Sequence, residues 1–156
     1  MADGSWTDQI GLPCVVMTAD CLPVLLCDEA GTRIAAVHAG WRGLAAGVVE
    51  SAVHALGEGQ WMAWLGPAIG PDAFEVGGEV RDAFLNRLTE AEGAFRQGNE
   101  GRWYADIYVL AELVLRRCGV DRIYGGGYCT MTEVDRFFSY RRDGRTGRMA
   151  TLIWLR

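Results

Sequence analysis

The sequence predicts an α+β fold in which mixed β-sheets pack against helices. Short apolar runs bounded by Pro, Asp and Gly open the chain, and runs of about four to eight such residues are typical of buried strands. Longer segments follow in which apolar residues recur every three or four positions, which indicates helices. The two kinds of segment do not alternate strictly along the chain. Separate layers of sheet and helix are therefore favoured over a doubly wound parallel sheet.

Four strands are predicted in the first half of the chain. Three apolar runs, at residues 13–18, 22–27 and 33–38, are the first of them, and the turn-like sequence DEAGT separates the second from the third. If these two strands are antiparallel neighbours, the start of one lies beside the end of the other. A further strand is predicted within residues 61–71, where Gly and Pro then follow too densely for the strand to continue.

Three helices are predicted from apolar periodicity. The segment 43–59 carries one apolar stripe and has Gly57 near its end, where glycine commonly stops a helix. The segment 77–88 is the second predicted helix. The third, 105–120, has the clearest signal, because Asp106 can serve at its N-terminus and a stripe of Leu, Val and Ile follows.

The remaining segments are predicted to be loops and late strands. Residues 89–102 are polar and are interpreted as a mobile loop. Residues 122–130 indicate a strand that meets a glycine-rich turn, and the sequence RRDGRTGR at 141–148 indicates a solvated hairpin. A last strand is predicted for MATLIWL at 149–155.

Composition and charge limit the possible functions. The 156 residues fit one domain, residues 1–156, and half of them are hydrophobic, which is enough for one core. The net charge is −5, and the basic residues are all arginines and form no basic stripe of the kind that binds nucleic acid. No apolar run approaches the ~18 residues of a membrane helix. Five cysteines without a CxxC pair are typical of a reduced, cytoplasmic protein.

Cys21 and His38 form the first candidate site. Cys21 lies at the start of one predicted strand and His38 at the end of the next, so antiparallel pairing places both at the same edge of the sheet. A thiolate and an imidazole can bind zinc together, or a histidine can activate a cysteine nucleophile. A packing role for both residues is the alternative without chemistry.

An anion site is predicted beside this pair. Gly40, Trp41, Arg42 and Gly43 stand at the predicted start of a helix, where unpaired N–H groups and the helix dipole favour negative charge. Arg42 adds a fork of donors that suits phosphate. The other histidine, His54, falls on the far side of that helix from its apolar stripe and is interpreted as a surface residue.

Five separated blocks of sequence match the motifs of a known family in the same order. They are TADCLPVLL, AAVHAGWRGLAAGVV, LGPAIGP, FEVGGEV and the closing CT…FFSYRRDGRTGRMATLIWL. With these blocks the chain resembles the laccase-domain, or multicopper polyphenol oxidase, family, whose members are also described as purine nucleoside phosphorylases (YfiH-like). The resemblance implies a compact α+β domain with a metal ion, usually zinc and possibly copper, bound by two histidines and one cysteine. Cys21 in TADC and His38 in HAGWRG match two of these ligands.

The third metal ligand of the family has no counterpart in this sequence. In the family it is a histidine in an N-terminal segment with an HG motif, and this sequence holds no such motif. The chain is therefore expected to be a truncated version of a longer protein, with a weaker and more open metal site. Loss of the strands around that ligand is expected to expose part of the core.

The resemblance implies phosphorolysis of adenosine, inosine or methylthioadenosine, together with deamination of adenosine to inosine. The partners are then a nucleoside and phosphate, and neither nucleic acid nor a membrane. Asp20 is a candidate general acid or base, or a residue that orients the metal ligands. Arg42 is the candidate holder of the phosphate. The full set of candidate site residues is Asp20, Cys21, His38, Arg42, Arg141 and Arg142.

Three alternative functions stay open at this point. A copper-dependent polyphenol oxidase of the usual laccase type uses about ten histidines, and this chain has two, so the residues do not support it. A cysteine hydrolase would use Cys21 as the nucleophile and His38 as the base. A non-catalytic metal-binding module would keep the metal ligands without turnover. The sequence leaves the oligomeric state open.

Overall fold

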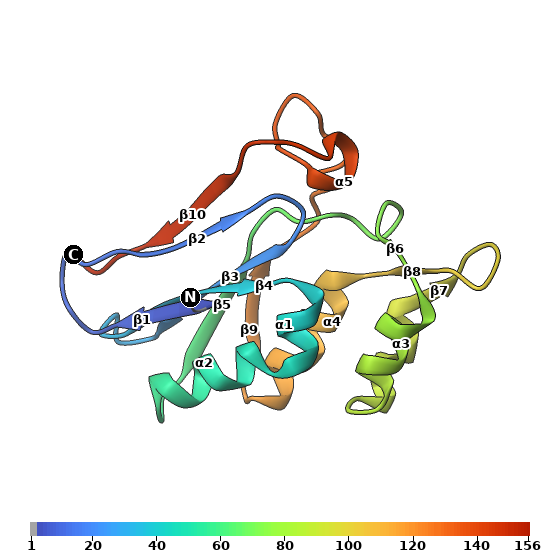
Figure 1. Ribbon diagram of the computed structural model, residues 1–156. Helices are drawn as coiled ribbons and strands as arrows, with labels where there is room; N and C mark the ends of the chain where they lie inside the picture. Colours follow the sequence, from blue (N-terminus) through green and yellow to red (C-terminus); the bar gives the residue numbers. More distant parts are fainter. Residues whose placement is uncertain (1–2) are drawn as a thin grey trace.

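The fold is built on a five-stranded β-sheet (Figure 1). The computed structural model describes residues 3–156. The strand order of this sheet is β1-β4-β3-β5-β9. Neighbouring strands are antiparallel except for β5 and β9, which are parallel. The strands are β1 (Gly4–Thr7), β4 (Ile34–Ala39), β3 (Leu22–Asp28), β5 (Trp61–Leu65) and β9 (Arg122–Gly125). The predicted mixed α+β architecture is therefore confirmed.

The alternation of side chains along β3 explains how the sheet holds two cores. Leu22, Val24 and Leu26 are fully buried on one face, in the main hydrophobic cluster. Leu25 and Cys27 point to the other face, because successive residues of a strand alternate, and they pack against a smaller cluster. The sheet therefore needs a covering layer on each side.

Helices cover the first face of the sheet. Their buried residues join the main cluster, and the helices lie together on one side of the sheet in Figure 1. They are α1 (Trp41–Ala46), α2 (Val48–Leu56), α3 (Gly78–Leu85) and α4 (Ile107–Arg117). Asp106 caps α4 as predicted, since its carboxylate accepts hydrogen bonds from the N–H groups of Tyr108 and Val109. None of the helices within residues 3–156 has both the length and the apolar character needed to cross a bilayer.

A two-stranded sheet lies over part of the other face. It joins β2 (Cys14–Thr18) to β10 (Met149–Ile153) in antiparallel register. Its inward residues Cys14 and Val16 pack with Ile34 and Ala36 of β4. A third small sheet, of order β6-β8-β7, lies beside α3 and consists of β6 (Glu75–Val76), β8 (Trp103–Ala105) and β7 (Phe95–Gln97).

The structure corrects several of the expected elements. The helix predicted over 43–59 is two helices, because Gly47 adopts φ 94°, a left-handed conformation that ends α1. Residues 89–102 hold a 3-10 helix, η1 (Thr89–Ala94), and strand β7, and Ala91, Ala94 and Phe95 are buried in the main cluster. The prediction of a mobile loop was wrong because a few apolar residues among many polar ones are enough to anchor this segment.

Two further differences lie near the ends of the chain. RRDGRTGR does not begin as a hairpin but as a short helix, α5 (Tyr140–Asp143). The hydroxyl of Ser139 caps it by accepting from the N–H of Arg142, and serine at this position favours a helix start over a strand. The short, mostly exposed edge strand β1 was not predicted, because its sequence GSWT lacks an apolar alternation.

The stability of the turn between β3 and β4 depends on pH through the carboxylate of Asp28. This buried carboxylate accepts hydrogen bonds from the N–H groups of Thr32 and Arg33 and from the Thr32 hydroxyl. Burial alone would raise the pKa of Asp28, but these hydrogen bonds, with a smaller contribution from the Arg33 charge, hold the pKa below its ordinary value of 3.8. The ionised carboxylate therefore stabilises the fold above pH 3.8, and this stabilisation is lost as the pH falls through the lower folded-state pKa.

We expect Asp28→Asn to remove part of the loss of stability at acid pH. The free energy of unfolding, measured by urea denaturation at a series of pH values, should fall less steeply below pH 3.8 than in the unmodified protein. Asp135→Asn, at an exposed position, is the control and should leave the slope unchanged. Equal slopes for Asp28→Asn and the unmodified protein would contradict this account of the turn.

Candidate functional site

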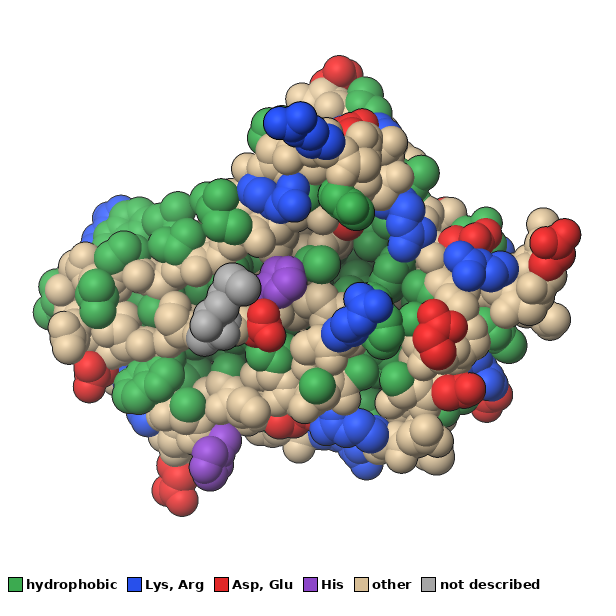
Figure 2. Space-filling model, viewed as in Figure 1, with side chains coloured by type: hydrophobic (Ala, Val, Ile, Leu, Met, Phe, Trp, Pro, Cys, Tyr) green, Lys and Arg blue, Asp and Glu red, His purple; other side chains and the backbone are tan. Residues whose placement is uncertain are grey.

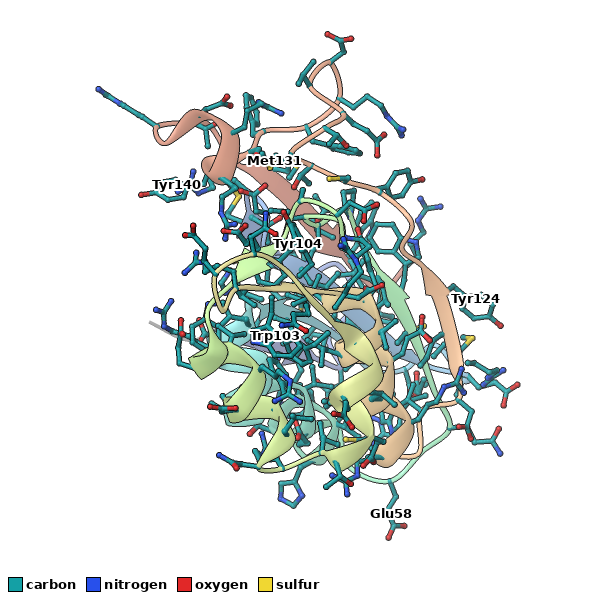
Figure 3. All side chains as sticks on the ribbon, turned by 90° about the vertical axis from the view of Figure 1, so that its right-hand side faces the viewer. Glu58, Trp103, Tyr104, Tyr124, Met131 and Tyr140 are labelled. Carbon is teal, nitrogen blue, oxygen red and sulfur yellow. The ribbon has the colours of Figure 1, made fainter. Side chains whose placement is uncertain are left out.

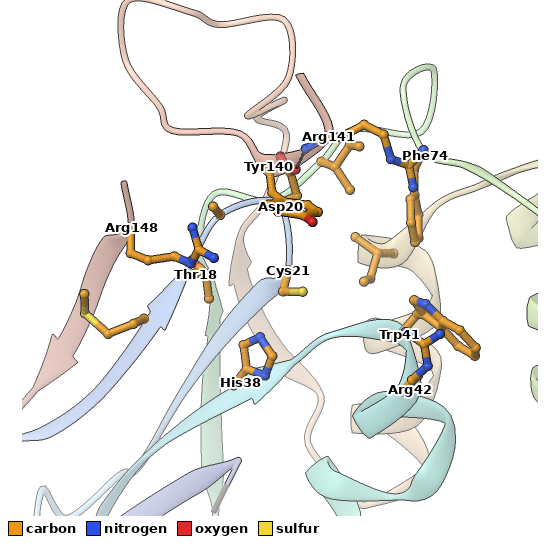
Figure 4. A pocket seen from close by; sticks show the side chains of 14 residues that line it. Thr18, Asp20, Cys21, His38, Trp41, Arg42, Phe74, Tyr140, Arg141 and Arg148 are labelled. Carbon is orange, nitrogen blue, oxygen red and sulfur yellow. Dashed lines mark hydrogen bonds between the residues drawn. The ribbon is translucent and has the colours of Figure 1, made fainter. Parts of the chain in front are cut away.

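A pocket of about 390 Å³ opens where the β2–β3 loop, the end of β4, the start of α1 and helix α5 meet (Figure 4). Its volume lies within the range of about 300–1,000 Å³ that is common for small-molecule sites. Figure 2 shows this face of the molecule hollowed, with arginine side chains around the hollow and hydrophobic ones on its floor. Five of the candidate residues line the pocket, namely Asp20, Cys21, His38, Arg42 and Arg141.

Cys21 and His38 lie next to each other because of the strand register. In the antiparallel pair, Leu22 faces Ala39 and Pro23 faces His38, so Cys21 and His38 meet at one edge of the sheet, as predicted. A Cβ atom placed on Gly40 would lie 3.0 Å from the Sγ of Cys21 and 3.4 Å from the Cε1 of His38. The two side chains therefore converge over the backbone of Gly40.

Asp3, which directly precedes β1, contacts His38. The N–H of His38 donates to the carbonyl of Asp3 at 2.6 Å, and a carboxylate oxygen of Asp3 lies 3.7 Å from the Nδ1 of His38. The second distance exceeds that of a hydrogen bond, so the hydrogen bond between the two residues is the backbone one. No local sequence pattern indicates this contact, because it depends on the pairing of β1 with β4.

The environment of Cys21 disfavours its use as a nucleophile without a metal. Burial raises the pKa of the Cys21 thiol, and the Asp20 carboxylate raises it further, whereas Arg148 and Arg42 only partly offset this. A catalytic cysteine needs a lowered pKa so that the thiolate is present at neutral pH. The hydrolase alternative is therefore disfavoured.

The sulfur of Cys21 and the imidazole of His38 suit zinc, although together they supply only part of its coordination sphere. Thiolate sulfur and imidazole nitrogen are the ligands that zinc prefers. Within residues 3–156, no group of three or more His, Cys, Asp or Glu side chains is placed to hold a metal ion. The described part of the chain thus offers two side chains that could hold zinc, Cys21 and His38, where catalytic zinc sites usually have three protein ligands.

Asp20 joins three loops beneath the pocket. Its carboxylate is buried and accepts from the Thr130 hydroxyl at 2.6 Å and from the N–H of Arg141 at 2.6 Å, one bond to each oxygen. Its backbone carbonyl accepts from the N–H of Ile69. The residue has φ 83°, a left-handed conformation that aspartate tolerates better than most residues. Since both carboxylate oxygens are engaged, the geometry favours a positioning role over general acid–base catalysis.

Arginine and aromatic side chains form the rim of the pocket. Arg42 stacks on Trp41 at 4.4 Å, and Arg141 lies over Phe74 and donates to the carbonyl of Glu75. Because α1 has only six residues, attraction of an anion rests on the arginine charges rather than on the dipole of this helix. The lining residues that were not among the candidates include Phe74, Tyr140 and Arg148.

Arg142 has different surroundings from Arg141. Its guanidinium donates to the backbone carbonyls of Thr130, Met131 and Phe137 and pairs with the carboxylate of Asp143. It is not among the residues that line the pocket. The side chain therefore fixes the loop that leads to α5, and its contacts give it no direct approach to a ligand there.

Gly40 provides a test of the Cys21 and His38 cradle. Its backbone, φ −61° and ψ 156°, is allowed for alanine, so the main effect of Gly40→Ala is the added methyl group at 3.0 Å from the Cys21 sulfur. We expect zinc affinity, measured by competition with a chromophoric chelator, to fall about tenfold or more. Gly43→Ala is the control, because its methyl would meet its nearest neighbour at 3.5 Å. Equal affinity in both variants would show that the two side chains do not bind a metal over Gly40.

Comparisons with known proteins cover the whole chain. The sequence model of a family described as "Multi-copper polyphenol oxidoreductase laccase" matches residues 1–156. A purine nucleoside phosphorylase of Pseudomonas aeruginosa is 58% identical over 157 residues, a match that covers 99% of this chain and 65% of that relative. The purine nucleoside phosphorylase YfiH of Escherichia coli K12 is 56% identical over 156 residues, covering 99% of this chain and 64% of YfiH. The chain thus spans a little under two thirds of these relatives.

Solved structures share the fold. The crystal structure of the Neisseria meningitidis protein NMB0706 superposes with a TM-score of 0.97 at 57% identity and covers 99% of this chain and 64% of its own. That of YlmD from Geobacillus stearothermophilus gives a TM-score of 0.94 at 32% identity, over 100% of this chain and 62% of its own. The arrangement of sheets and helices described above is therefore the arrangement of these proteins.

Proposed function

Because the chain belongs to the family described as multi-copper polyphenol oxidoreductase laccase, and relatives in its comparisons are named purine nucleoside phosphorylases, we propose that it forms the site of a zinc-dependent purine nucleoside enzyme. The proposal rests on one observation. A cysteine–histidine pair, an arginine rim and aromatic side chains surround a single pocket. Two of these parts match groups of the substrates, since aromatic rings can pack against a purine and guanidinium groups bind phosphate.

Phosphorolysis of adenosine requires a held phosphate and a departing base. A phosphate oxygen forms a bond to C1′ as the bond from C1′ to N9 breaks, and the adenine takes the electron pair and a proton, leaving ribose 1-phosphate. Arg42, Arg141 and Arg148 are the proposed holders of the phosphate, because all three line the pocket. Trp41 and Phe74 are the proposed contacts for the purine. Asp20 keeps the backbone of Arg141 at the pocket edge through its hydrogen bond.

The proposed zinc ligands are Cys21 and His38. Zinc in such a site supplies a water molecule of lowered pKa and so a nucleophile near neutral pH. Deamination of adenosine needs water to add at C6 as ammonia leaves, giving inosine. The chain's own part is to place the imidazole beside Cys21 through the β3–β4 register and to keep the purine beside the pair.

A copper oxidase is a poorer match to the residues. A type 1 copper site takes two histidines and a cysteine, and a laccase needs a further copper cluster. The second histidine of this chain, His54, is exposed on α2 and is not among the residues that line the pocket, as the sequence predicted for a surface residue. The cysteine and the single histidine of this pocket therefore favour zinc binding over the copper chemistry named in the family description.

The test separates the two reactions. The zinc-loaded chain is incubated with adenosine, with and without phosphate, and the products are separated by chromatography. Adenine that forms only with phosphate indicates phosphorolysis, and inosine in either case indicates deamination. Cys21→Ala is the control and should form neither. The same assay is run on the chain joined to the part of the P. aeruginosa relative that lies outside the match; no product from either protein would refute the proposal and favour a non-catalytic module.

A further inference from the structure

Thr18 is a polar residue at a position where the strand pattern calls for an apolar one. The inward residues of β2 are Cys14, Val16 and Thr18, and the first two pack in the smaller hydrophobic cluster. Thr18 is 2% exposed and lines the pocket. Within residues 3–156, its hydroxyl has no hydrogen-bond partner. Because buried polar groups are normally hydrogen-bonded, this hydroxyl is a group that a bound molecule can satisfy.

Arg148 brings a positive charge to the same end of the pocket. Met149 pairs with Thr18 in the β2–β10 sheet, so Arg148, the residue before Met149, lies beside the end of β2. Its Nη1 donates to two backbone carbonyls of its own loop. Among the described residues, Arg148 forms no ion pair. The acidic side chain of the pocket lining, Asp20, has both oxygens engaged elsewhere, so the charge of Arg148 is available to an anion.

Thr18 and Arg148 lie at the opposite end of the pocket from the aromatic side chains. In Figure 4, Cys21 and His38 stand between these two residues and the end that holds Trp41. The other two arginines of the pocket lie against aromatic rings at that end. Figures 1 and 3 show the chain from α5 to β10 standing out from the helices that cover the main sheet. Arg148 and α1 therefore approach the pocket from different sides.

We propose that Thr18 and Arg148 form the phosphate subsite of the pocket, an inference that rests on the proposed function. The hydroxyl donates to one phosphate oxygen, and the guanidinium donates to others. A ribose hydroxyl would also satisfy Thr18, but it would leave the charge of Arg148 without a partner. Phosphate satisfies both. The purine then lies at the aromatic end, and of the three arginines proposed to hold phosphate, Arg148 makes the main contact.

Binding of inorganic phosphate tests this assignment, because calorimetric titration of the zinc-loaded chain measures it without turnover. We expect Thr18→Val to weaken phosphate binding about tenfold or more, since valine has nearly the same shape but no hydroxyl. Thr18→Ser keeps the hydroxyl and should retain most of the affinity. Arg148→Met should also weaken binding about tenfold or more. The matched control is Arg145→Met, an exposed arginine of the same loop that does not line the pocket, and it should leave the affinity unchanged.

The stability of Thr18→Val separates binding from folding. Valine suits the buried position and removes a hydroxyl without a partner, so the free energy of unfolding in the absence of phosphate should not fall. Added phosphate should raise the midpoint of urea unfolding more in the unmodified protein than in this variant. During phosphorolysis of adenosine, the KM for phosphate should rise more than the KM for adenosine.

Three results would overturn the assignment. One is an unmodified chain that does not bind phosphate. Another is unchanged phosphate affinity in Thr18→Val, which is expected if the hydroxyl binds only a water molecule. The third is a loss of affinity in Arg42→Met without a loss in Arg148→Met, which would place the phosphate at the aromatic end. A chain that binds phosphate as expected but consumes no adenosine would refute the proposed reaction and still support the subsite.

Discussion

Cys21→Ser is expected to lower zinc affinity at least about a hundredfold and to abolish turnover of adenosine. Serine fills nearly the same volume in the half-buried site, so the fold should persist, but a hydroxyl is a far poorer zinc ligand than a thiolate. The loss should be seen by competition with a chromophoric chelator and by chromatography of the reaction products. His38→Ala should have a similar effect, because it removes the other proposed ligand, which lines the same pocket.

Cys27→Ser provides the control for this experiment. Cys27 is likewise half-buried, but it lies at the other end of β3 and lines a different groove. Its replacement should leave zinc affinity unchanged. If Cys21→Ser binds zinc as well as Cys27→Ser does, Cys21 is not a ligand and the metal site lies elsewhere.

Asp20→Ala is expected to reduce turnover about a hundredfold or more, whereas Asp20→Asn should retain most of it. Alanine leaves the buried Thr130 hydroxyl and the N–H of Arg141 without an acceptor, and each loss costs about 1–3 kcal/mol. It also releases Arg141 from the pocket edge, and small misplacements of binding groups cost rate. Asparagine can satisfy both partners: its oxygen accepts from Arg141, and its amide donates to the Thr130 hydroxyl, which can accept as well as donate.

The two Asp20 variants distinguish positioning from proton transfer. A general acid or base would be lost equally in Asp20→Asn and Asp20→Ala, since neither side chain titrates. A positioning residue would be rescued by asparagine in both turnover and the free energy of unfolding. Turnover should therefore be measured as kcat and KM separately, alongside urea denaturation, because loss of Arg141 from the pocket should raise KM as well as lower kcat. Equal inactivity of both variants would restore the acid–base hypothesis.

The sequence predicted the parts of the site that depend on neighbouring strands. One short turn and one antiparallel pair of strands bring Cys21 and His38 together. Both features can be predicted from local sequence patterns. Asp3 and Thr130 could not be found in this way, because they reach the site through the β1–β4 pairing and through a loop more than a hundred residues from Asp20. Their role follows from topology, which no local pattern records.

Helices and strands were predicted correctly where the apolar periodicity is strong. They were missed where the conformation or burial of a few residues determines the structure. The strands near the start and helix α4 were placed within a few residues of their observed ends. The break at Gly47 was missed, because glycine inside a helical pattern is tolerated as often as it terminates one. In residues 89–102, the buried Ala91, Ala94 and Phe95 are too few to form a periodic pattern, yet they are enough to fix the segment against the core.

The pairing of β2 with β10 also sets the order in which the chain can fold. It joins Cys14 to Ile153, nearly the two ends of the chain, so it is among the contacts with the largest loop to close and is slow to form. During synthesis, β2 remains unpaired until the residues of β10 have been made. Because Thr18 of β2 and Arg148 next to β10 both line the pocket, the site is completed only in this late step. Until β10 has formed, β2 therefore remains an apolar strand without its partner.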